Sequence, residues 1–105
     1  MKLLIEPSNK NKLYLDIVDG VILPLDDLAV ESNIYFTLEE IEKISKNYND
    51  VEIFVKINKN LMNDDIDKVK DALIKLDNLK VKGIFFYDLA ILQLKKELNL
   101  DVDLV

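Results

Sequence analysis

Residues 51–58 read Val-Glu-Ile-Phe-Val-Lys-Ile-Asn, and this stretch decides the fold. Its odd-numbered positions are all aliphatic, whereas its even-numbered positions are Glu52, Phe54, Lys56 and Asn58. Successive side chains of a strand point to opposite faces of the sheet. One face therefore suits a covering layer of helices, while the other carries charge. The stretch predicts a strand with two chemically different faces.

Four further short apolar runs, two on each side of this stretch, predict strands as well. They are Lys2–Glu6, Val21–Leu23, Gly83–Tyr87 and Val102–Val105. Helical patterns lie between the strands, and crossovers through helices imply a parallel sheet. The sequence thus predicts an α/β fold of parallel βα repeats with five strands and about four helices. This order resembles the first half of a TIM-type barrel; a flavodoxin-like three-layer sandwich is the alternative.

The helix after Phe36 has the clearest predicted start. Thr37 and Glu40 have the spacing of a capping box, and Phe36 and Ile41 occupy the hydrophobic-staple positions. Leu38, Ile41, Ile44 and Tyr48 would form the buried stripe of this helix.

The other three helices have weaker signals. A short one is expected early in the chain, with Leu13, Tyr14, Ile17 and Val18 on one face. Another should begin near Asn63 or Asp64 and bury Ile66, Val69, Ala72, Leu73 and Leu76. The last should begin after Asp88 and run to about Leu98.

The 105 residues fit one β/α domain, residues 1–105. The chain stops in or just after its fifth strand with no helix to follow, so we expect a fragment of a larger barrel. Such a half would leave two strand edges and an inner face open, the latter with Leu4, Ile22, Phe54 and either Phe85 or Phe86. We therefore expect self-association into a homodimer.

Composition excludes several classes of function. The net charge of −6 and the absence of Arg argue against a nucleic-acid partner. The chain has no Cys and no His, which removes thiolate nucleophiles, histidine bases and the usual zinc and iron–sulfur ligands. We expect no cofactor and no metal. No apolar run approaches the ~20 residues of a membrane span, so a cytoplasmic protein is expected. The many Asn, Lys and Ile residues are typical of an AT-rich bacterial genome, so a bacterial source is expected.

Three polar residues are expected at the mouth of the half-barrel. Ligands of parallel β/α folds meet the carboxyl ends of the strands. Glu6, Lys56 and Asn58 lie there and share the predicted inner face. A carboxylate beside a lysine can do acid–base work or hold an anionic substrate, although an internal ion pair is the simpler interpretation. These three residues are the predicted substrate face; no catalytic residue can be assigned.

The remaining acidic residues have structural explanations. Asp64 and Asp65 open a predicted helix, where carboxylates favour the positive end of the dipole. Asp26 and Asp27 form a loop that is typical of a solvated turn, and Asp88 is positioned to cap the last helix.

Several motifs in succession resemble the collagenase-like peptidases, the U-32 peptidase family. The opening Leu3–Asn9 resembles that family's Leu-Leu-Ala-Pro-Ala-Gly-Asn entry. The others are Phe36–Ile41, the strand Val51–Asn58, the helix start Asn63–Ile66 and Gly83–Leu92. The resemblance covers nearly the whole chain, and it implies a TIM-like barrel in a protease-type hydrolase.

The sequence also departs from that family's pattern. Glu6 and Ser8 replace small residues of the opening, Pro24–Asp27 replaces glycines, and the downstream cysteine-bearing signature is absent. The resemblance therefore implies an N-terminal fragment of a U-32 peptidase-family protein that is inactive alone, with a peptide as the possible substrate of the full-length protein. A non-catalytic binding or scaffolding domain is the alternative.

Overall fold

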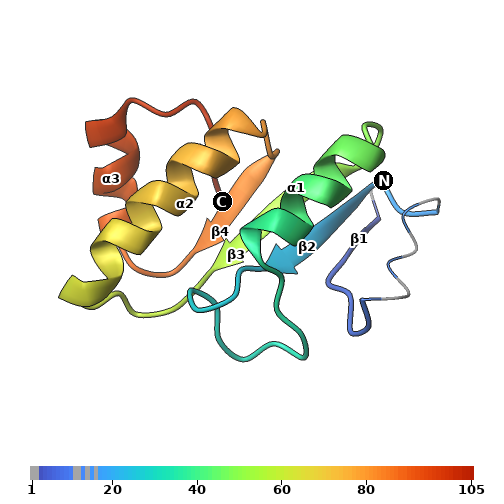
Figure 1. Ribbon diagram of the computed structural model, residues 1–105, viewed down its shortest axis with the longest axis horizontal. Helices are drawn as coiled ribbons and strands as arrows, with labels where there is room; N and C mark the ends of the chain where they lie inside the picture. Colours follow the sequence, from blue (N-terminus) through green and yellow to red (C-terminus); the bar gives the residue numbers. More distant parts are fainter. Residues whose placement is uncertain (1–2, 11–12, 14, 16) are drawn as a thin grey trace.

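The computed structural model describes residues 3–10, 13, 15 and 17–105 (Figure 1). Its strands are β1 (Leu4–Ile5), β2 (Gly20–Pro24), β3 (Glu52–Ile57), β4 (Gly83–Phe86) and β5 (Asp103–Leu104). Its helices are α1 (Leu38–Asn47), α2 (Ile66–Asn78) and α3 (Ala90–Leu98), and a short 3-10 helix, η1 (Asn63–Asp65), leads into α2. All five predicted strands are confirmed, with β1 and β5 shorter than expected.

The strands form one parallel sheet in the order β1-β2-β3-β4-β5. Each strand therefore pairs only with its neighbours along the chain. A flavodoxin-like sheet has the order 2-1-3-4-5 and divides its helices between two faces. A sequential parallel order is that of a TIM-type barrel. The prediction of parallel βα repeats is confirmed, and the order is that of a half-barrel.

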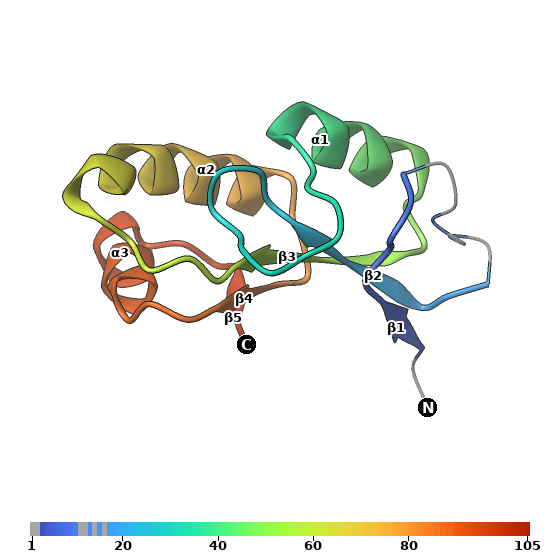
Figure 2. The ribbon, with the colours of Figure 1, turned by 90° about the horizontal axis from the view of Figure 1, so that it is seen from below.

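The described helices lie on one side of the sheet. Figure 2 shows α1 and α2 above the strands and α3 below α2, at the end of the sheet that carries β4 and β5; no helix of the described residues covers the opposite side. The burial of β3 alternates accordingly, with Ile53, Val55 and Ile57 buried and Phe54 and Lys56 partly exposed. We call the uncovered side the inner face. The two-faced strand predicted from residues 51–58 is confirmed.

The core lies between the sheet and the helices. It is one cluster in which Leu23, Val55 and Ile84 of the sheet meet Leu73 and Leu76 of α2, all with 0% exposure. Burying these aliphatic side chains is the main term that stabilises such a domain. Among the described residues, no helix has the length and apolar character needed to cross a membrane.

The predicted capping box of α1 is confirmed. The amide of Glu40 donates to Thr37 Oγ1 over 3.2 Å, and the amide of Thr37 donates to Glu40 Oε1 over 3.0 Å. The backbone hydrogen bond from Thr37 and the nearby Lys10 ammonium lower the pKa of Glu40 below its ordinary value. Two amides that have no partner inside the helix are thereby satisfied.

Thr37→Ala is expected to lower the free energy of unfolding by about 1 kcal/mol, because it removes the acceptor for the Glu40 amide. Lys43→Ala is the control, since Lys43 is exposed on the same helix. Thermal melts followed by circular dichroism would compare the two variants. Equal melting temperatures would contradict the assigned role of Thr37.

The described residues contain three α-helices and the 3-10 helix η1, compared with the expected number of about four helices. Of the residues predicted to form the first helix, Leu13, Ile17 and Val18 lie in turn or irregular backbone, and Tyr14 lies outside the described residues. Asp19, the residue before β2, is bonded to the residue before β1. Its carboxylate accepts a hydrogen bond from the Leu3 amide over 2.6 Å. The backbone amide of Asp19 in turn donates to the Leu3 carbonyl.

Candidate functional site

The carboxyl ends of β1 and β3 bring Glu6 and Lys56 together. In the register of the sheet, Leu4 pairs with Gly20 and Gly20 with Glu52. By alternation Glu6 and Lys56 then lie on the inner face. The Lys56 ammonium reaches across β2, so that its Nζ lies 3.1 Å from Glu6 Oε1. The sequence predicted that these two residues would lie close together, and in the structure they form an ion pair.

A third polar group, from the loop between β2 and α1, completes this cluster. The Lys56 ammonium donates to Ser32 Oγ over 3.0 Å, and the Ser32 amide donates to the Tyr35 hydroxyl over 3.2 Å. We call Glu6, Ser32 and Lys56 the Lys56 cluster. Sequence reasoning missed Ser32, because it lies in a long loop with no local pattern to place it beside β3.

Buried side chains hold that loop against the end of the sheet. Leu25, Leu28, Ala29 and Phe36 are all buried. Leu25 and Phe36 form a parallel bridge that is continued by a hydrogen bond from the Phe36 amide to the Pro24 carbonyl, 2.8 Å long. The loop that carries Ser32 is therefore fixed by its own small core.

Asn58, the third residue of the predicted substrate face, forms hydrogen bonds with the backbone of the β2–α1 loop. Its Oδ1 accepts from the Val30 amide over 2.8 Å, and its Nδ2 donates to the Val30 carbonyl over 3.2 Å. Both functions of the amide group are thus used on the backbone of the β2–α1 loop. Asn58 lies at the predicted edge, but its hydrogen bonds hold the loop to the end of β3.

The Lys56 cluster lies at the boundary with solvent. The side chains of Lys56 and Glu6 retain 20% and 32% of their exposure. A partly exposed ion pair contributes about 0–1 kcal/mol to stability, so the fold does not depend on it. An ammonium has three N–H donors, and Glu6 and Ser32 account for two of those of Lys56 among the described residues. This arrangement can present a fixed positive donor to a carbonyl or carboxylate oxygen.

Acidic side chains at the same edge of the sheet accept hydrogen bonds from backbone amides. Asp88 accepts from the amides of Ala90 and Leu61, each over 2.9 Å, and these hydrogen bonds lower its pKa. It thereby joins the start of α3 to the loop after β3. The N-cap position of α3 is Leu89, one residue after the predicted Asp88.

Asp65 plays a similar part at the start of α2. Its carboxylate accepts from the Met62 amide, and this bond, followed by the contact with Lys59, lowers its pKa. Asp26 and Asp27 lie in an exposed turn in which Asp26 accepts from the Asp27 amide. In the described part of the chain, no three acidic side chains gather closely enough to hold a metal ion.

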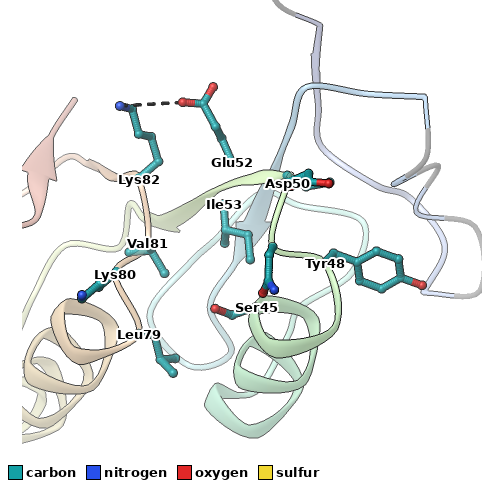
Figure 3. Close-up of a pocket in the computed structure, with 11 residues that line it drawn as sticks. Ser45, Tyr48, Asp50, Glu52, Ile53, Leu79, Lys80, Val81 and Lys82 are labelled. Carbon is teal, nitrogen blue, oxygen red and sulfur yellow. Dashed lines mark ion pairs between the residues drawn. The ribbon is translucent and has the colours of Figure 1, made fainter.

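Several hollows of the described surface lie away from the Lys56 cluster, and two of them are considered as sites. One, of about 330 Å³, opens at the amino end of β3 near the end of α1 (Figure 3). Lys82 and Glu52 pair at its rim with Nζ and Oε2 3.7 Å apart. The other, of about 300 Å³, lies between α1, α2 and the turn at Asp27. In parallel β/α enzymes the amino-end rim serves stability, whereas substrates meet the carboxyl ends. The first hollow lies at the amino-end rim, and the second lies between the helices rather than on the inner face of the sheet. We therefore base a function on the Lys56 cluster.

The comparisons agree with this architecture. A family model described as Peptidase family U32 matches residues 9–105. No curated protein and no solved structure matches the chain. The family match covers every described element from β2 to β5. With nearly its whole length matched, the chain belongs to peptidase family U32.

Proposed function

We propose that this chain is the amino-terminal, substrate-holding part of a larger U32-family peptidase and does not cleave peptides by itself. The family name supplies peptides as the substrate class. The observation that carries the proposal is the Lys56 ammonium, held at the carboxyl edge between Glu6 Oε1 and Ser32 Oγ. A donor fixed in this way suits a peptide carbonyl or a terminal carboxylate.

The chemistry of the cluster supports binding rather than cleavage. A serine nucleophile needs an adjacent base to take its proton. The ammonium that forms an ion pair with Glu6 carries no lone pair, so it donates to Ser32 Oγ and cannot accept its proton. The sequence contains no His and no Cys to serve instead. Ser32 therefore has no activating base in the described part of the cluster.

The open inner face supports a role within a larger assembly. In complete parallel barrels the substrate mouth is built from the loops of all eight strands. Here five strands supply one side of such a mouth. A purely scaffolding role is the competing proposal, and it predicts that Lys56 has no part in binding.

Two measurements test the proposed function. First, quenched fluorescent gelatin should remain uncut by this chain, at the rate of the buffer alone. Second, a fluorescently labelled gelatin peptide should bind in an anisotropy titration, and Lys56→Met should weaken binding about 10- to 100-fold, because a hydrogen bond to a charged group contributes about 1.5–3 kcal/mol.

Lys82→Met is the matched control. Lys82 also pairs with a glutamate, Glu52, but at the amino end of the strands. Its replacement should leave peptide binding unchanged. Equal weakening by both variants would show that general charge attracts the peptide and would contradict the assigned site. Cleavage of the gelatin that is lost in Lys56→Met would contradict the non-cleaving role.

A further inference from the structure

The inner face is apolar in its centre and uncovered by the described helices. Ile22 of β2 pairs with Phe54 of β3, and Leu4 of β1, which pairs with Gly20, lies on the same face one row nearer the amino end. Phe85 of β4 lies beside Phe54, with ring centroids 5.5 Å apart. Leu4 is 36% exposed, and the other three are partly exposed. Contiguous apolar patches of this kind mark contact surfaces.

The charges on the inner face nearly cancel. Lys56 pairs with Glu6 at its carboxyl end, and Lys82 pairs with Glu52 at its amino end. Figure 3 shows Lys82 and Glu52 on the side of the sheet away from Ile53 and Val81. Asp103, whose backbone pairs with Gly83, adds one further carboxylate. Among the described residues, these three carboxylates and two ammonium groups sum to −1 of the chain's −6. Two copies would therefore repel each other least when these faces meet.

The edges of the sheet set the orientation of such a pair. β1 and β5 each have one neighbour in the sheet, so each has an edge available for another strand. All strands of one copy run parallel. A two-fold axis along the strand direction would place β5 of one copy beside β1 of the other, and these two strands would run in the same direction. An axis across the strands would place the edges antiparallel and the carboxyl ends at opposite rims.

The size of the face indicates a reversible contact. Five strands about 4.8 Å apart and a six-residue strand rising about 3.3 Å per residue give a face of roughly 24 by 20 Å. Its area of roughly 480 Å² is below the ~800 Å² per partner of a standard stable interface. Val105, which is 54% exposed and lies beside Gly83 and the Phe54 ring, enlarges it at one margin.

We propose that two copies of this chain pair inner face to inner face about a two-fold axis parallel to the strands. Closed two-fold pairs are the commonest symmetric assembly. Both carboxyl edges then lie at one rim, so the Lys56 clusters of the two copies line a single opening. The pairing does not depend on the proposed peptide binding, because it rests on the centre of the face and not on the Lys56 cluster.

Sedimentation equilibrium from low to high micromolar concentration tests the pairing. The wild-type chain should rise from 12.2 kDa toward twice that mass. Phe54→Asp and, separately, Ile22→Glu should remain monomeric at the concentration where the wild type is paired, because each sets like charges against each other across the axis. Circular dichroism would verify that each variant is folded.

Ile74→Asp is the matched control, since Ile74 is an apolar residue that is 41% exposed on α2, on the helix side of the sheet. It should pair as the wild type does. Raising the salt concentration should not weaken the pair, because an apolar centre and a nearly neutral face leave little attraction to screen.

Three results would overturn the proposal. A wild-type mass of 12.2 kDa at every concentration would leave the face to another occupant, such as a further part of a longer chain. Pairing that survives both inner-face variants, or that is lost in Ile74→Asp, would place the contact elsewhere. Dissociation by salt would replace the apolar contact with an ionic one.

Discussion

Replacing Leu76 by alanine is expected to lower the free energy of unfolding by about 2–5 kcal/mol, since it removes a buried isobutyl group and leaves a cavity. Leu76 is 0% exposed and lies on α2, in the cluster between helices and sheet. Small domains are stable by only about 5–15 kcal/mol, so this one change removes a large share of the total. Urea unfolding followed by far-ultraviolet circular dichroism, at one protein concentration, would measure the loss.

Ile74→Ala provides the comparison on the same helix. Ile74 is two residues away but 41% exposed, so its side chain loses little contact on truncation. We expect a change within about 1 kcal/mol, because substitutions away from buried features have small effects. If the two variants had equal urea midpoints, α2 would have to face the sheet with a different side.

Gly20→Ala is expected to lower the free energy of unfolding by about 1–3 kcal/mol, because the added methyl group overpacks a close contact. A Cβ at Gly20 would lie 2.6 Å from Leu4 Cδ2 and 2.8 Å from the carbonyl oxygen of Glu52. The leucine can rotate away, but the carbonyl belongs to the ladder between β2 and β3 and cannot move without disturbing it. This clash outweighs the gain of about 0.4–1 kcal/mol from a stiffer unfolded chain.

Gly83→Ala is the matched variant for this position. A Cβ there would meet only side chains, Val105 Cγ2 at 3.0 Å and the Phe54 ring at 3.2 Å. Val105 is exposed and near the end of the sheet, so it can shift. The loss of stability should be smaller than for Gly20→Ala in the same urea titration. The reverse order would show that the β2–β3 ladder accommodates a methyl group more easily than the inner face does.

Patterns of short period predicted most of the fold. The alternation in residues 51–58 fixed which side of β3 meets helices, and the Thr37 capping box located the start of α1. These signals depend on residues only a few positions apart, so they can be recognised without knowing how distant parts of the chain pack. Glu6 and Lys56 could be placed together because parallel strands end at a common edge.

The missed features depend on longer-range packing. Ser32 reaches Lys56 because the β2–α1 loop folds onto buried Leu25, Leu28 and Phe36, and no local pattern indicates that path. The amide of Asn58 bonds the Val30 backbone for the same reason. The expected first helix rested on apolar spacing alone, and in the described residues Leu13, Ile17 and Val18 form no helix.

The sequential strand order also has a consequence for how the chain reaches this structure. Because each strand pairs only with the strand before or after it, every ladder closes across a single connection. Topologies that pair neighbouring elements fold faster than those that join more distant segments. During synthesis, β2 can pair with β3 before α2 has left the ribosome, and each later βα unit docks onto a partner that is already formed. Growth in this direction always leaves a newly formed strand edge ready for the next unit.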